Sequence, residues 1–234
     1  MRSKTIPDED VLLEFDAVAE EAATMSFLPR AAELQEAAVK HIEKFLQKLA
    51  ERKLEYVRNS DEDAANCVLG MEFALRAAQA ELSMWLKVKQ ENAEEGWNDL
   101  VTAQELLGAA LLVHRQLELD TTAIENLLRR LSFIEHWIFP PQMFSSMGGR
   151  AKRRECSICG AEYAECAHVV GRAYMGKMCH TVVREMTIAE VSIVTNPADK
   201  RCRITHFSDH EKKRNKMTWR LEETAKTSQS QVEQ

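Results

Sequence analysis

The chain has 234 residues, a formal net charge of −6 and 45% hydrophobic residues. No uninterrupted run of about 18 apolar residues occurs, which argues against a membrane-spanning helix. The N-terminal stretch MRSKTIPDEDVLLEFD is interrupted by acids and lacks the apolar centre of a signal peptide. We therefore expect a cytoplasmic protein.

The balance of charge changes near residue 145. Residues 1–145 hold 15 basic and 26 acidic side chains, whereas residues 146–234 hold 16 and 11. Two units with different surfaces follow from this shift. We divide the chain into an acidic helical bundle (1–140), a basic linker (141–154), a zinc-binding module (155–207) and a polar tail (208–234).

Long helices are predicted for the first unit, where Ala, Leu, Glu, Lys and Gln dominate. Apolar residues at spacings of three and four predict helices over 8–26, 29–57, 60–85, 97–112 and 120–139. Pro29 is expected in the first turn of the second helix, and Ser60 as the N-cap of the third. Trp85, Trp97 and Trp137 are expected in the core. The predicted fold class is mainly α, an antiparallel helical bundle followed by a small α+β zinc-binding module.

One pair in the bundle raises the question of catalysis. Arg130 and His136 lie six residues apart in RRLSFIEH, a spacing that resembles the arginine–histidine signature of the HEPN ribonucleases. Leu131 follows Arg130 where that family usually has a polar residue. We favour an arginine on a solvated face and a histidine whose cation suits the helix C-terminus, with the ribonuclease as the alternative.

Four of the six cysteines lie within CSICGAEYAECAHVVGRAYMGKMC, residues 156–179. In a reducing compartment such clusters are metal ligands more often than disulfides. Cys156 and Cys159 have the spacing of a zinc knuckle, and Gly160 can supply its left-handed turn. Cys166 and His168 complete a closed Cys3His set, which is typical of structural zinc.

Cys179 is an alternative fourth ligand in place of Cys166, and the sequence leaves the choice open. A thioredoxin-like pair lacks the surrounding βαβ pattern, and an iron–sulfur cluster is a further alternative. We favour one structural Zn²⁺, because a small module buries little apolar surface and zinc can contribute on the order of 10 kcal/mol to its folding.

The region after the cluster predicts two short strands, one at Val191–Val194 and one near Ile204, joined by a turn at 196–199. Beyond Phe207 we expect a solvated helix or a disordered tail. Basic residues surround the cysteines and indicate a surface for nucleic acid or for a protein. They are Arg150, Lys152, Arg153, Arg154, Arg172, Lys177, Lys200, Arg201 and Arg203.

The run CSICG-x2-Y-x2-C-x-H-x2-G-x2-Y-x-G-K-x-C, followed by EVSIVTNPA, resembles a cysteine-rich segment of tailed-phage and prophage proteins. Some of these are similar to prohead (head-maturation) proteases. The resemblance covers residues 156–204 and implies structural roles for Gly171, Tyr174 and Gly176. It also implies metal ligands among Cys156, Cys159, Cys166, His168 and Cys179. No segment matches the catalytic strands of the protease, so proteolysis is not expected.

Together these patterns predict a non-enzymatic, zinc-stabilised adaptor of a phage, prophage or phage-defence system. Its bundle would bind a protein partner or itself, and its zinc module would bind protein or nucleic acid. The alternatives are the ribonuclease that uses Arg130 and His136, and an accessory subunit of a larger enzyme complex.

Overall fold

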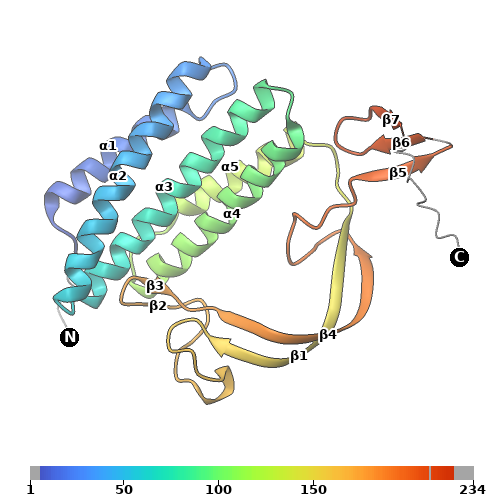
Figure 1. Cartoon of the computed structure of the whole chain (residues 1–234). Coiled ribbons are helices and arrows are strands. Elements are labelled where there is room, and N and C mark those ends of the chain that lie inside the picture. Colours follow the sequence, from blue (N-terminus) through green and yellow to red (C-terminus); the bar gives the residue numbers. More distant parts are fainter. Residues whose placement is uncertain (1–5, 211, 224–234) are drawn as a thin grey trace, which may run out of the picture.

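The computed structural model describes residues 6–210 and 212–223. Its N-terminal part consists of helices α1 (Glu9–Met25), α2 (Ala32–Arg58), α3 (Glu62–Lys89), α4 (Ala93–Gln116) and α5 (Thr122–Ile138). Successive helices run antiparallel and are joined by short turns (Figure 1). Small antiparallel sheets follow, which confirms the predicted class of helical bundle plus α+β module. None of the helices within these residues is long and apolar enough to cross a membrane.

The helix starts differ from the prediction at two places. Asp61, rather than Ser60, caps α3, and its side chain accepts a hydrogen bond from the backbone N–H of Ala64 at 3.2 Å. Ser60 has a φ of 58°, so it ends the preceding turn in a left-handed conformation and cannot also open the helix. Pro29 lies ahead of α2, whose N-cap is Ala31.

The bundle holds two apolar clusters on opposite sides of α3. Ile42, Leu49 and Leu75 belong to the cluster that α1, α2 and α3 share. Trp97 and Leu131 belong to the cluster of α3, α4 and α5. The expected core position of Trp137 is wrong, since this side chain is 74% exposed and stacks on Phe133 at the surface.

The C-terminal module is built on a long two-stranded ribbon. Strands β1 (Phe144–Cys156) and β4 (Thr181–Val194) pair antiparallel over their whole length. Between them the chain forms the short helix η1 (Tyr163–Glu165) and the hairpin of β2 (Ala173–Tyr174) and β3 (Lys177–Met178). A sheet of β5 (His206–Asp209), β6 (Lys212–Asn215) and β7 (Leu221–Glu223) follows.

The strand predicted at Val191–Val194 is confirmed as the end of the longer β4, but its partner is the upstream β1. The strand predicted near Ile204 is wrong, since Ile204 lies in no strand and β5 begins at His206. The segment treated as a basic linker therefore lies largely within β1. Instead of a helix or disordered tail, the predicted tail forms the end of β5 and strands β6 and β7 as far as residue 223. These strands have no apolar alternation, and ion pairs such as Arg214–Asp209 connect them. Residues 224–234 lie outside the described part. The proposed domain boundaries stay a prediction.

The ribbon is attached to the bundle at both ends, and its middle bows away from the helices (Figure 1). At one end Phe144 and Met217 join the cluster around Trp97. At the other end Ala173 of the hairpin packs with Leu69 and Val113. The module thus uses the bundle as the support for both ends of the ribbon.

Candidate metal centre

The first two candidate ligands lie where β1 ends. Cys156 is the last residue of β1, and a tight turn brings Cys159 back beside it through a hydrogen bond from Gly160 N to the Cys156 carbonyl at 2.9 Å. Gly160 has a φ of 74°, the left-handed conformation that its lack of a Cβ makes accessible. The backbone N–H of Ile158 also donates to the Cys156 sulfur at 3.4 Å. This is the local geometry of a zinc knuckle.

The second pair follows η1. Cys166 leaves this short helix in an extended conformation, and the backbone N–H of His168 donates to its sulfur at 3.2 Å. The His168 ring meets the ring of Tyr174 edge-on at 4.7 Å, and the Tyr174 hydroxyl accepts a hydrogen bond from Val169 N. The β2–β3 hairpin thereby sets the orientation of the imidazole.

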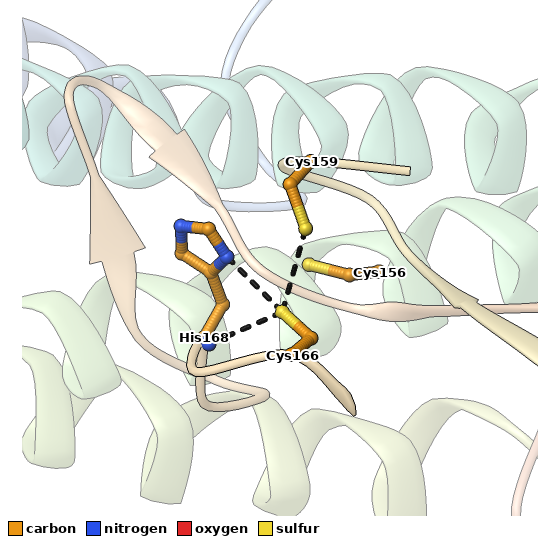
Figure 2. Close-up of side chains that lie close together, drawn as sticks. All are labelled: Cys156, Cys159, Cys166 and His168. Carbon is orange, nitrogen blue, oxygen red and sulfur yellow. Dashed lines mark hydrogen bonds between the residues drawn. The ribbon is translucent and has the colours of Figure 1, made fainter. Parts of the chain in front are cut away.

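Figure 2 shows the four side chains converging from these two loops. One ligand atom from each of Cys156, Cys159, Cys166 and His168 lies within 4.8 Å of all the others. The Cys159 and Cys166 sulfurs are 3.4 Å apart, and Cys166 Sγ is 3.2 Å from His168 Nδ1. Sulfurs around a tetrahedral zinc with bonds near 2.3 Å would be separated by roughly 3.8 Å. The cluster could therefore hold a metal ion.

The pKa values of the Cys156 and Cys166 thiols shift in opposite directions. Burial raises the pKa of Cys156, but the backbone N–H groups of Cys159 and Ile158 outweigh it and bring the pKa to about 6. The His168 N–H lowers the pKa of Cys166, yet burial and the neighbouring thiols raise it to about 11. A thiolate at Cys156 thus disfavours ionisation of the neighbouring thiols. A divalent cation between them would instead favour the thiolate forms and displace the remaining thiol protons.

Cys179 lies at the edge of the cluster. Its sulfur is 3.8 Å from the Cys156 sulfur, and the side chain is buried. It is not part of the group in which every ligand atom is close to every other. The geometry therefore favours Cys166 over Cys179, the choice that the sequence left open.

The basic residues divide into two groups. Arg150, Lys152, Arg153 and Arg154 are exposed on β1, and Arg172 and Lys177 are exposed near the hairpin. Three others contact the bundle, so they are less available to a partner. Lys200 pairs with Glu135 at 2.6 Å, Arg201 with Glu105 at 2.8 Å, and Arg203 lies over the Trp97 ring at 5.9 Å.

Arg130 and His136, the two residues of the ribonuclease alternative, do not line a common cavity. Arg130 forms an ion pair with the buried Glu81 and lines a cavity that His136 does not touch. His136 lines a different cavity near Phe139, and its Nδ1 bonds the Ser132 carbonyl of its own helix at 2.7 Å. The two side chains thus have separate structural contacts.

Two polar residues that the sequence analysis passed over, the buried Asn66 and the half-buried Gln116, connect the metal loops to the bundle. Asn66 of α3 accepts from Gly176 N at 2.8 Å and donates to the Ala173 carbonyl at 3.2 Å. Gln116 of α4 bonds both the N–H and the carbonyl of Ala173. An asparagine inside an otherwise apolar helix face was the signal that could have revealed this contact.

Comparison of the chain with protein-family models, curated proteins and solved structures found no match.

Proposed function

We propose that the chain is a non-enzymatic interaction protein whose C-terminal module is stabilised by one Zn²⁺. The observation that carries this proposal is the Cys3His cluster at the end of a ribbon with an open apolar face. We further propose that it acts as an adaptor in a phage, prophage or phage-defence system, on the basis of the resemblance of residues 156–204.

The composition of the cluster supports a structural ion. Four protein ligands complete a tetrahedral shell and leave no position for a reacting water. Thiolates select zinc over magnesium or calcium, which prefer oxygen. Cys156 lies opposite Thr181 in the last pair of the ribbon, so an ion at this place would fix the separation of the two strands and the start of the hairpin loops.

The register of the ribbon places its apolar side chains on one face. Alternate residues of a strand share a face, and directly opposite residues of paired strands do too. Residues 145, 147, 149 and 151 of β1 lie opposite Ile193, Val191, Ile188 and Met186. Ala189 has no partner in this register, and the resulting bulge keeps Ile188 on the same face as Val191.

This apolar face consists of Met147, Met186, Ile188, Val191 and Ile193, which are 48–68% exposed. The two strands approach each other closely at Gly149, where an added Cβ would lie 2.4 Å from the Thr187 carbonyl oxygen. An isolated two-stranded ribbon is marginally stable in water, and contiguous exposed apolar patches mark interaction sites. We infer that this face is covered by a protein surface.

The other face of the ribbon is polar. Arg150 and Thr187 lie opposite each other there, as do Gly148 and Glu190. Glu155 pairs with both Arg153 and Arg184. Glu155, Glu185 and Glu190 offset three of the five basic charges on β1 and β4. The smaller net charge reduces the attraction for a phosphate backbone, so a protein partner is favoured over nucleic acid.

The partner that fits best is a second copy of this chain. The apolar face bears no charged residue between Ser145 and Ala151 or at the positions opposite them, so two copies can meet without like-charge repulsion. In a two-fold dimer the same patch is used on both subunits, and homodimer interfaces are more apolar than other interfaces.

Light scattering coupled to size-exclusion chromatography tests whether the chain forms a dimer through the apolar face. We expect the wild type to be a dimer and Val191→Glu/Ile193→Glu to be monomeric at the same concentration, with at least about 100-fold weaker association, or roughly 2.7 kcal/mol. Ser192→Glu, on the polar face between the two, is the matched control and should remain dimeric. All three side chains are at least partly exposed, so the fold should be retained.

A monomeric wild type, or a double variant that remains dimeric, contradicts association through this face. Bound nucleic acid that is released as salt is raised would instead assign the ribbon to nucleic-acid binding, because phosphate contacts weaken strongly with salt.

A further inference from the structure

The four clustered cysteines of the module lie in two pairs, one accessible and one buried. In the accessible pair, Cys159 is exposed and Cys166 is half-buried, and their sulfurs are 3.4 Å apart (Figure 2). In the buried pair, the sulfurs of Cys156 and Cys179 are 3.8 Å apart, and the two residues are 2% and 1% exposed. A small reagent in solution therefore reaches the accessible pair first.

The accessible pair has the properties of cysteines that react with oxidants. Such cysteines combine thiolate character, contact with solvent and a second thiol close by that resolves the first product. A bound metal ion would supply the first property, because a thiolate is the form of cysteine that ligates a metal. The exposure of Cys159 and the 3.4 Å distance to the Cys166 sulfur supply the other two.

A bond between these two sulfurs would remove half of the metal shell. Only a small movement of the side chains is needed, because a disulfide joins its sulfurs at about 2 Å. Neither sulfur would then be a thiolate that can hold the ion. Of the four clustered ligands, Cys156 and His168 would remain, and two ligands do not complete the shell of a structural zinc.

We propose that Cys159 and Cys166 are an oxidative modification site, at which a peroxide forms a disulfide and releases the metal ion. This inference rests on the proposed zinc centre and adds a reaction to it. The module would thereby lose its ion when peroxide is present and regain it when a dithiol reductant restores the two thiolates.

The reaction consumes one peroxide for each disulfide. The Cys159 sulfur attacks a peroxide oxygen, the O–O bond breaks, hydroxide leaves and a sulfenic acid forms. The Cys166 sulfur then attacks the Cys159 sulfur, the S–O bond breaks and a second hydroxide leaves as the disulfide forms. The two sulfurs give up two electrons, which reduce the peroxide, and Zn²⁺ leaves with its charge unchanged.

Cys156 is the competing thiol that an experiment has to distinguish from Cys166. Its sulfur also lies within 4.8 Å of the Cys159 sulfur. Cleavage after basic residues and after glutamate separates the cysteines into the peptides Cys156–Glu162, Cys166–Arg172 and Met178–Arg184. A disulfide between Cys156 and Cys159 stays within the first peptide, whereas the proposed disulfide links the first peptide to the second.

Hydrogen peroxide added to the purified full chain tests the proposal. The zinc content is measured first, and zinc released by about one equivalent of peroxide is then followed with a metal-binding dye. Mass spectrometry of the digest identifies the linked cysteines by fragmentation. We expect zinc release, with the Cys159–Cys166 disulfide at least about 10-fold more abundant than any disulfide of Cys156 or Cys179. Addition of dithiothreitol and Zn²⁺ should restore the zinc content.

Cys179→Ser and Cys202→Ser are the matched controls. Each removes a thiol that lies outside the four clustered ligands, buried in the first variant and exposed in the second. Both variants should retain zinc, release it at the wild-type rate and form the same disulfide. Slower release from Cys179→Ser would make Cys179 the resolving thiol and would overturn the proposed pair.

Zinc that stays bound in excess peroxide would overturn the modification site. So would release that leaves Cys159 as a sulfinic acid without a disulfide, because the Cys166 sulfur would then have no part in the reaction. A wild type that contains no zinc would contradict the proposed function instead. The disulfide map then decides separately whether Cys159 and Cys166 react as a pair.

Discussion

The helical bundle and the C-terminal module of this chain are stabilised in different ways. The bundle has two clusters of buried apolar side chains that share α3. In the described part of the module few side chains are buried, among them Phe144, Cys156, Ala173, Cys179 and Met217. The module has contacts with the bundle at both ends of the ribbon, and we propose that a metal ion in the Cys3His cluster supplies the remaining stability. A small unit can keep a defined shape without a core of its own if other interactions fix its loops.

The largest difference between the bundle and the module is expected when a metal ligand is removed. Cys159→Ser should abolish metal binding and unfold the module while the bundle stays helical, because zinc can contribute about 10 kcal/mol or more to such a unit. Metal analysis should find one zinc per wild-type chain and none in the variant. Limited proteolysis should then cleave the variant after about residue 144.

Cys202→Ser is the control for this experiment, since Cys202 is exposed and lies outside the cluster. It should retain one zinc. A wild type that contains iron or no metal would contradict the zinc proposal, and a folded, zinc-bound Cys159→Ser would contradict the ligand assignment.

A smaller effect is expected where the module docks on the bundle. Asn66→Ala removes both side-chain hydrogen bonds to the hairpin, at Gly176 N and the Ala173 carbonyl. Gly176 N would then remain buried without a partner, whereas the Ala173 carbonyl would keep its hydrogen bond from Gln116. Docking should therefore weaken by about 1–3 kcal/mol. Hydrogen exchange of the Gly176 and Met178 amides should accelerate, while that of the bundle should not.

The matched control is Asn126→Ala on the exposed surface of α5, which should leave the exchange of the hairpin unchanged. Unaltered exchange in Asn66→Ala would mean that the hairpin is held by Gln116 and the apolar contacts alone.

The smallest effect is expected for ion pairs at the surface. Arg201→Ala removes a bidentate pair with Glu105, with both N–O distances at 2.8 Å. The pair is solvent-accessible, so its loss should reduce the free energy of unfolding by only about 0.5–1 kcal/mol. Arg220→Ala, which breaks a more exposed pair with Glu91, should have no measurable effect. Urea denaturation can compare them, and a loss larger than that for Asn66→Ala would reverse the expected order.

The bundle shows how much a sequence can determine through local patterns. Apolar residues spaced by three and four predicted the helices, because one helix face repeats every few residues regardless of what covers it. The spacing of Cys156 and Cys159, with Gly160, likewise indicated a knuckle whose geometry is set within one turn. Helix ends were less certain, and Asp61 replaced Ser60 as the cap because the conformation of the preceding turn decides where a helix can begin.

Only the tertiary structure decided which distant segments meet. A strand pattern such as Val191–Val194 does not specify its partner, and the choice of β1 over a local hairpin depends on the whole ribbon and its two attachments. The same holds for Arg201 and Arg130, which look like free cations in the sequence and have acidic partners in the fold. Local periodicity is encoded by neighbours along the chain, whereas pairing, burial and the shape of a cavity depend on contacts between residues that are far apart in the sequence.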